Sequence, residues 1–402
     1  MADHDLPINT TLHTLVTRAA GLWTLDACGV TRSQKAIPAL VHRDAYAPST
    51  PCTRVLLVGG LSGRHEDAAL VLHALEAYVD AGEQLTDGLA LSAVPCGNPD
   101  GLALGVAPEN GVGGQPENGY PPSDNFFYDA HNPERRYLWR WVGLQAPDLI
   151  LELRAGPSVV WEASEVTASL APALQAGRVG PSDAFLAALG ASMHNGVAPN
   201  GLAPIPGLRL TTPRQELEAQ LGRLWSLLAQ TPGLRPSPAR HVLDARRART
   251  PLEVARLLAT VYGHTLDPVV YTQGMAISGR LRLSRLDPTV ADPTPDIVQL
   301  VEPYVSGARA VFHDRAAPSA MAGLIWAIQL TEVTRDFRYA ELLVSIAERY
   351  RPGVAGGAPP PPPIPPPPPP PPPGPPPPGA PGMTPPPQQS TAASKGSRQA
   401  TM

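Results

Sequence analysis

Apolar runs of strand length alternate with polar loops and helical patterns over the first 160 positions of the chain. Residues 54–58 form a run of strand length that is apolar after Arg54 and ends at two glycines, and apolar periodicity over 68–78 predicts a helix. Two further buried strands are predicted at 88–95 and 148–153, and a proline-initiated helix at 133–144 lies between them. This alternation predicts an α/β domain.

Polar residues follow three of these strands and are the first candidates for function. The strands end near Ser62, Asn98 and Arg154, and right-handed crossovers are expected to bring these ends to one edge of a sheet. Ligands of open α/β sheets bind outside the carboxyl ends of the strands. The candidates in the first loop are Ser62, Arg64, His65, Glu66 and Asp67. An alternative interpretation is a solvated helix start, at which Glu66 and Asp67 complement the helix dipole.

The remaining pattern predicts where the domains begin and end. A short helix is expected at 11–22, with a turn at Cys28-Gly29, and an amphipathic helix at 213–228 closes the first domain. Three regions follow from these patterns: an α/β domain at 1–232, a helical domain at 240–351 and a disordered proline-rich tail at 352–402. In the helical domain, Thr250 and Pro251 are expected to start a helix with a threonine cap.

The segment 358–387 is almost pure proline, which favours extended polyproline II without a core. Its functional interpretation is a ligand for a polyproline-binding protein or a semi-rigid spacer. The alternative is a low-complexity extension without a partner.

Composition narrows the functional classes. The 402 residues carry a formal net charge of −4, and only 16% are charged, so no basic field for nucleic acid is expected. The three cysteines are widely separated, which predicts neither a disulfide framework nor a zinc knuckle. The N-terminus has no secretory pattern and no apolar run has membrane-spanning length, so we expect a soluble, cytoplasmic protein without membrane association.

Three motifs in residues 50–160 resemble the zinc carboxypeptidase superfamily, which includes carboxypeptidase A and the succinylglutamate desuccinylase and aspartoacylase enzymes. They are GGLSGRH at 59–65, Asn-Pro-Asp-Gly at 98–101 and Glu-Leu-Arg at 152–154. The family pattern is Gly-Gly-x-His-Gly-x-Glu, then Asn-Pro-Asp-Gly, then a strand that ends in Asp-Leu-His. The resemblance implies a carboxypeptidase-like mixed sheet flanked by helices.

The resemblance places Ser62, His65 and Arg154 at the three zinc-ligand positions. A catalytic zinc needs three His or carboxylate donors and an open position, whereas Arg154 is a permanent cation. No counterpart of the general-base glutamate is recognisable at 155–230, nor of the substrate-binding Asn-Arg pair at 124–127. The sequence therefore predicts a pseudoenzyme with a degenerate zinc site and no cofactor.

The predicted role is binding of an anionic small molecule or a peptide terminus at the former metal site. The guanidinium of Arg154 is expected to hold the anion. The predicted ligand-binding residues are Arg64, Asn98, Asp100, Arg136 and Arg154. A simpler possibility is a salt bridge from Arg154 to Glu66 or Asp67, which leaves a scaffold without a ligand.

Two alternatives belong to other functional classes. One is an active zinc hydrolase with a rearranged metal site at His65 and Glu66, completed by His131 or Glu152. The other is an interaction protein that acts through the proline-rich tail. A Ser62-based hydrolase is disfavoured because Arg64 stands where a nucleophile elbow needs glycine.

Residues 240–350 show a weaker resemblance to the (α/α) barrel of the unsaturated glucuronyl and rhamnogalacturonyl hydrolases. The segments that carry it are 277–283, 322–326 and 334–340. Because a complete barrel needs more helices than fit before Pro352, this resemblance implies a truncated, toroid-like domain.

Overall fold

The computed structural model describes residues 7–48, 50–82, 88–122, 129–167, 169–180, 184–191, 201–231, 235–312 and 318–348. The proline-rich tail predicted at 352–402 lies outside these residues. The chain divides into two compact units, Met1–Leu257 and Leu258–Met402. Residues 240–257, expected in the helical domain, therefore group with the first unit.

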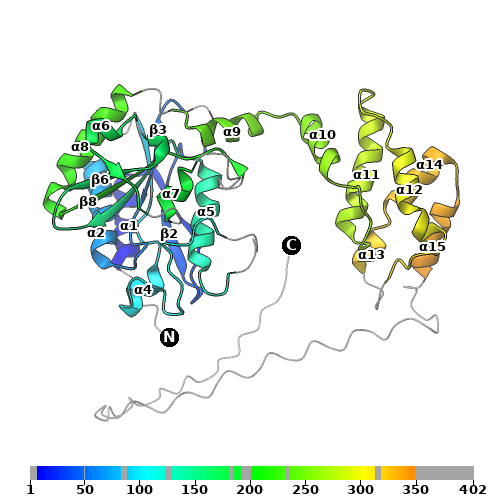
Figure 1. The fold of residues 1–402 in the computed structure, drawn as a ribbon, viewed down its shortest axis with the longest axis horizontal. Helices are drawn as coiled ribbons and strands as arrows, with labels where there is room; N and C mark the ends of the chain where they lie inside the picture. Colours follow the sequence, from blue (N-terminus) through cyan, green and yellow to red (C-terminus); the bar gives the residue numbers. More distant parts are fainter. Residues whose placement is uncertain are drawn as a thin grey trace, which may run out of the picture. The chain divides into compact units, whose positions relative to one another are not determined.

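Within the described residues, eight strands form one mixed sheet in the first unit, in the order β1-β2-β4-β3-β5-β8-β6-β7 (Figure 1). The strands are β1 (Trp23–Val30), β2 (Ala36–His42), β3 (Thr53–Val58), β4 (Leu89–Val94), β5 (Leu149–Ala155), β6 (Val160–Ala163), β7 (Gly177–Arg178) and β8 (Gly207–Thr212). Strands β4, β3, β5 and β8 run parallel to one another. The pairs β1–β2, β2–β4 and β8–β6 are antiparallel, and β7 pairs parallel with β6.

Helices cover both faces of this sheet. They are α1 (Pro7–Arg18), α2 (His65–Asp80), α4 (Pro99–Leu104), α5 (Pro133–Gln145), α6 (Ala171–Leu174), α7 (Phe185–Leu189), α8 (Leu217–Gln230) and α9 (Pro238–Arg247). Two 3-10 turns lie at Glu165–Thr167 and Arg214–Glu216. The predicted α/β class, a mixed sheet flanked by helices, is confirmed.

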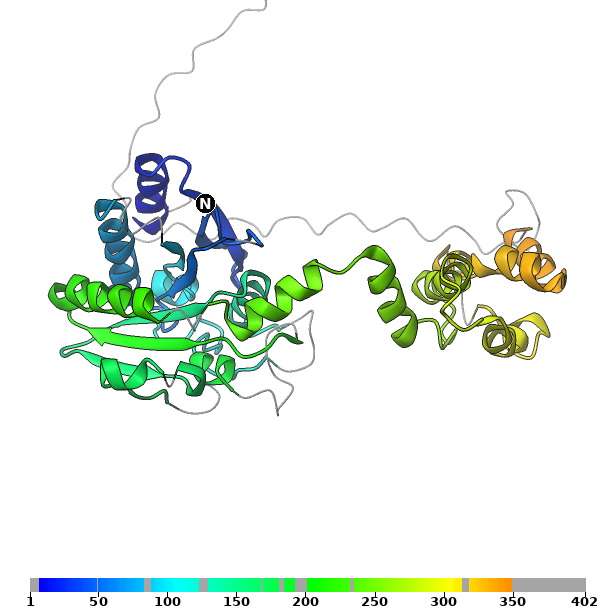
Figure 2. The ribbon, with the colours of Figure 1, turned by 90° about the horizontal axis from the view of Figure 1, so that it is seen from above.

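Alternate side chains of the central strands pack into two separate cores. Leu57 and Leu151 face the core formed with α1, α2 and α8 (Figure 2). Leu56 and Ile150 face the opposite core, formed with α5, α7 and α9. Burial on both faces explains why these strands read as continuous apolar runs rather than as alternating patterns.

The N-terminal region differs from its prediction in two places. The helix expected at 11–22 is α1, which lies four residues earlier, at Pro7–Arg18. The turn expected at Cys28-Gly29 is wrong, because β1 continues through both residues and pairs with β2, with a register shift between Ala27 and Gly29. A shift of this kind is a β-bulge, which inserts an extra residue without ending the strand. A Cβ atom at Gly29 would stand 2.2 Å from Cγ of Tyr137 on α5, so a glycine is needed for this close approach.

A buried ion pair fixes α9 to the sheet. Nη1 of Arg240 lies 2.7 Å from Oδ2 of Asp148, and both side chains are almost fully buried. Oδ1 of the same carboxylate accepts the backbone N–H of Ser237, immediately before α9, and Oδ2 also accepts the N–H of Arg54. These contacts explain why the first unit extends beyond the expected end at 232.

The second unit is all-helical over its described residues. Its helices are α11 (Tyr271–Leu286), α12 (Thr294–Val305), α13 (Pro318–Ala322), α14 (Trp326–Thr334) and α15 (Arg338–Glu348); α10 (Pro251–Val261) spans the division between the units. Their apolar core centres on Trp326, whose ring lies 6.2 Å from that of Tyr339. The resemblance to a toroid stays a prediction.

The predicted start of α10 is confirmed in atomic detail. Glu253 Oε2 accepts the backbone N–H of Thr250 at 2.7 Å, and Thr250 Oγ1 accepts the N–H of Glu253 at 3.2 Å. This reciprocal pair is a capping box. Among the described residues, no helix combines the length and apolar character needed to cross a membrane.

Candidate functional site

The three strand ends meet as the sequence predicts. Strand β3 lies between β4 and β5 and is parallel to both. The loops after β3 and β4 are joined by hydrogen bonds from Gly97 N to Gly59 O at 2.9 Å and from Asn98 N to Gly60 O at 3.0 Å. Gly60 has a φ of +55°, and a Cβ there would contact Cys96 at 3.0 Å. The glycine pair therefore allows the two loops to lie against each other.

Asp67 joins the first loop to the end of β5. Its Oδ2 accepts a hydrogen bond from Ser62 Oγ at 2.8 Å, and its Oδ1 accepts the backbone N–H of Ala155 at 2.8 Å. The residue is 3% exposed. The interpretation of Asp67 as part of a solvated helix start is therefore wrong. Its side chain is buried and links the two strand ends by hydrogen bonds.

Arg64, His65 and Glu66 are exposed at the start of α2. Arg64 Nε lies 3.9 Å from Glu66 Oε2, and an exposed ion pair of this kind contributes little to stability. Over the described ranges, no group of three or more His, Cys, Asp or Glu side chains gathers in a way that could hold a metal ion. His131, suggested as a further donor, is exposed, and its Nδ1 lies 3.4 Å from the carbonyl of Val112.

Arg154 belongs to a network of alternating charges. Its Nε donates to Glu152 Oε1 at 2.6 Å, and its Nη2 lies 3.2 Å from Glu117 Oε2. Glu152 Oε2 in turn accepts from both Nε and Nη2 of Arg209, each at 3.1 Å, and Arg209 Nη1 reaches Glu162 Oε2 at 3.3 Å. The suggested salt bridge to Glu66 or Asp67 is therefore wrong, because Arg154 pairs with Glu152 and Glu117.

The opposite charges in this network stabilise the ionised form of Arg154. Burial works against the charge of Arg154, but the nearby carboxylates of Glu152 and Glu117 outweigh it and raise the arginine pKa above its ordinary value. Glu152 is 1% exposed, and its two oxygens are divided between two guanidinium groups. The network contains three carboxylates and two guanidinium groups, so its formal charge is −1.

Asn98 and Asp100, predicted to bind ligand, make buried contacts within the protein. Asn98 caps α4 by accepting the N–H of Gly101 at 2.9 Å, and its amide donates to the carbonyls of Pro108 and Glu109. Asp100 Oδ2 accepts the N–H of Ser33 at 2.9 Å. The Asn-Pro-Asp-Gly motif thus starts a helix and anchors two loops.

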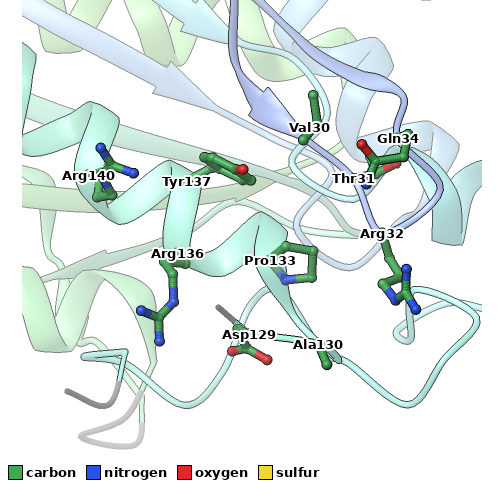
Figure 3. A pocket seen from close by; sticks show the side chains of 10 residues that line it. All are labelled: Val30, Thr31, Arg32, Gln34, Asp129, Ala130, Pro133, Arg136, Tyr137 and Arg140. Atoms are coloured by element: carbon green, nitrogen blue, oxygen red, sulfur yellow. The ribbon is translucent and has the colours of Figure 1, made fainter. Parts of the chain in front are cut away.

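Arg136 lies in a different place from Arg64 and Arg154. It lines a pocket of about 170 Å³ between α5 and the β1–β2 turn (Figure 3). The lining residues are Val30, Thr31, Arg32, Gln34, Asp129, Ala130, Pro133, Arg136, Tyr137 and Arg140. The i, i+4 spacing of Arg136 and Arg140 on a predicted helix could have indicated this surface. Arg32 could not have been found, because the pattern of the sequence does not place it beside α5.

The comparisons with known proteins concern the fold. No protein-family model matches the chain, and no curated protein matches it. Among solved structures, a metallo-carboxypeptidase from Burkholderia cenocepacia is similar at 14% identity and a TM-score of 0.43, over 60% of this chain and 68% of that chain. A metallo-carboxypeptidase from Pseudomonas aeruginosa is similar at 18% identity and a TM-score of 0.41, over 56% of this chain and 68% of that chain.

Bovine thrombin-activatable fibrinolysis inhibitor, solved in complex with tick carboxypeptidase inhibitor, is similar at 9% identity and a TM-score of 0.38, over 60% of this chain and 96% of that chain. The solved structures to which this chain is similar thus include two metallo-carboxypeptidases.

Proposed function

We propose that the α/β unit is a carboxypeptidase-like protein without metallohydrolase activity, which binds an anionic small molecule or a peptide terminus. The observation that carries this proposal is the network around Arg154. The guanidinium stands at the third zinc-ligand position of the resemblance and is held there by Glu152 and Glu117.

The side chains at the three ligand positions do not fit a catalytic zinc. Of Ser62, His65 and Arg154, only His65 carries a donor of the required type, and Ser62 Oγ is hydrogen-bonded to a buried carboxylate. The nearby Glu152 has both oxygens committed to arginines. A dication placed beside Arg154 would also be repelled by a group that stays protonated at all ordinary pH values.

The same network defines how an anion can bind at this edge. Because its formal charge is already −1, an added carboxylate is favoured only if it replaces one of the existing ones. Glu117 is the replaceable partner, because its ion pair with Arg154 is partly exposed, whereas Glu152 is buried. The side chain of Glu117 is 18% exposed and that of Arg154 is 31% exposed. We expect a ligand carboxylate to exchange with Glu117 and to pair with Arg154 in the bidentate manner typical of arginine.

The experiment compares peptides that differ only at their ends. A peptide with a free terminal carboxylate should bind, and its amidated form should not. Glu117→Gln removes the competing charge and should tighten binding by about tenfold, whereas Arg154→Gln should abolish it. Glu109→Gln, an exposed change in the same loop, is the matched control.

Equal binding of the free and amidated peptides, or loss of affinity in Glu117→Gln, would refute the exchange at Arg154. Release of the terminal amino acid during the incubation would refute the absence of hydrolytic activity.

A further inference from the structure

Strand β6 is paired along its whole length on one edge but along only half of its length on the other. Each of its four residues has a partner in β8. On the opposite edge, β7 pairs only with Glu162 and Ala163. Among the described residues, Val160 and Trp161 therefore have no strand beside them on that edge, and unpaired edges of this kind are templates for the addition of a further strand.

A pocket of about 410 Å³ lies at this open edge. Trp161 faces α8, where its Nε1 donates to Gln220 Oε1 at 3.1 Å, whereas Glu162 points to the opposite face of the sheet and pairs with Arg209. Both Trp161 and Glu162 line the pocket, together with Gly177 of β7. Because β8 covers the other edge of β6, a space that touches residues of both faces lies beside the strand. We call this space the β6 slot.

The backbone between α6 and β7 leaves the β6 slot open. Gln175 ends α6 with a φ of +54°, and the N–H of Ala176 bonds back to the carbonyl of Ala171 at 2.8 Å. The chain therefore enters the sheet only at Gly177, and Gln175 forms part of one wall of the slot. Since this turn is closed by hydrogen bonds within the protein, the slot exists before any ligand arrives, which lowers the entropic cost of binding.

The lining of the β6 slot is positively charged. It carries the guanidinium groups of Arg178 and Arg223 and the carboxylate of Glu162. Among the described residues, neither arginine forms an ion pair, and Arg223 Nη2 donates to the neutral carbonyl of Ala173. Glu162 belongs to the network around Arg154, whose formal charge is −1. Even when that whole network is counted, the two arginines leave a positive charge.

The two arginines and an exposed valine lie on different sides of an added strand. Arg178 pairs with Ala163 in the ladder, so it points to the same face as Trp161, toward α8, which carries Arg223. Val160 points to the opposite face and is 46% exposed. A strand in the slot would therefore place alternate residues beside the arginines and beside Val160.

The charge also decides between two possible occupants. If the same edge of a second copy paired here about a two-fold axis, Arg178 would come close to its own copy, and like charges on paired strands are destabilising. An acidic segment gains charge-assisted hydrogen bonds at the same place.

We propose that the β6 slot binds an extended peptide segment with alternating apolar and acidic residues, which adds a strand beside β6. Main-chain hydrogen bonds to β6 supply affinity, and the alternate side chains supply specificity. The acidic side chains pair with Arg178 and Arg223, and an apolar side chain contacts Val160. The slot is separate from the exchange at Arg154, which is not among its lining residues, and it requires no free peptide terminus.

The test is calorimetric titration of the full chain at low ionic strength with the peptide acetyl-Val-Asp-Val-Asp-Val-amide, whose blocked ends carry no charge. Arg178→Gln and Arg223→Gln should each weaken binding by about tenfold. Arg214→Gln removes an exposed arginine outside the lining, just before α8, and should bind as the wild type does. Arg154→Gln should also leave the affinity unchanged. The same peptide with Lys in place of both Asp residues should not bind.

N-methylated peptides distinguish an added strand from attraction between charges alone. Alternate residues of a strand direct their N–H groups to opposite edges, so only one set of N–H groups faces β6. One peptide carries N-methyl groups on both Asp residues and another on the central Val, and one of the two should lose binding. Val160→Glu, an exposed change that adds a carboxylate to the slot, should abolish binding of the unmodified peptide.

Absence of saturable binding to the wild type, unchanged binding in both Arg178→Gln and Arg223→Gln, or binding of both N-methylated peptides overturns the proposal. Loss of binding in Arg154→Gln alone would place the peptide at the strand ends, overturning the slot while leaving the proposed function intact. A dimer in light scattering that dissociates in Val160→Glu would assign the slot to a second copy and would also overturn the proposal.

Discussion

Replacing Glu152 by Gln should destabilise the α/β unit strongly. Its carboxylate accepts three hydrogen bonds from two arginines, at 2.6, 3.1 and 3.1 Å, and its side chain is 2% exposed. Breaking a buried ion pair by removing one partner costs about 3–5 kcal/mol, because the remaining charge stays buried without compensation. Here Arg209, at 9% side-chain exposure, would keep only its 3.3 Å contact with the partly exposed Glu162, so we expect a loss at the lower end of this range.

The assay is chemical denaturation followed by tryptophan fluorescence, with thermal unfolding as a second reading. In a domain of this size, about 3 kcal/mol corresponds to a fall of roughly 6–12 °C in the unfolding midpoint. Glu162→Gln is the matched control, because its carboxylate makes only one contact with the same Arg209, at 3.3 Å, and is 24% exposed. We expect it to cost below about 1 kcal/mol.

A double variant distinguishes the loss of the ion pair from a general disruption of the fold. Glu152→Gln with Arg209→Met removes both buried charges, so it should recover part of the stability lost in Glu152→Gln alone. A loss below about 1 kcal/mol for Glu152→Gln, or no recovery in the double variant, would refute the reasoning that the network is a mutually dependent set of buried charges.

Three further predictions concern the scaffold. Arg240→Met leaves Asp148 buried without its cation and should lower the free energy of unfolding by about 3–5 kcal/mol, measured by denaturation; a loss no larger than that of an exposed arginine would contradict the anchoring of α9. Gly29→Ala forces a Cβ into the ring of Tyr137 and should cost about 1–3 kcal/mol, whereas Gly88→Ala, whose Cβ meets no neighbour within 4 Å, should be close to neutral. Burial lowers the pKa of His42 from its ordinary 6.5 to about 4, so the unfolded state binds the proton first; stability is full above pH 6.5 and should fall by up to about 3 kcal/mol as the pH drops to 4, and His42→Asn should lack this slope.

The central sheet was predictable because its strands are buried on both faces. The predicted strands at 54–58, 88–95 and 148–153 correspond to β3, β4 and β5, and their parallel alignment follows from the helices between them. The edge of the sheet formed by β8, β6 and β7 was not predictable in the same way. Strands β6 and β7 have four and two residues, too short for periodicity to register, and β8 carries the polar residues Arg209 and Thr211 within its apolar run.

The candidate site was predictable in position but not in its contacts. The three strand ends follow from topology, whereas the partner of Arg154 depends on which carboxylates the fold brings close. Glu117 comes from the loop between α4 and α5, whose course no sequence pattern specifies. For Asn98 and Asp100, the sequence motif did not reveal the helix-capping and loop-anchoring contacts that the structure shows, and their predicted role in ligand binding stays a prediction.

The most direct test of the central claim is a zinc titration by calorimetry on metal-free wild-type protein and on His65→Ala, followed by elemental analysis after dialysis. The account predicts no stoichiometric zinc in either protein, because Arg154, paired with Glu152 and Glu117, stands at the position that the sequence resemblance assigns to the third ligand. One zinc per chain in the wild type that is lost in His65→Ala would contradict it, and hydrolysis of peptide amides would then be the next activity to assay.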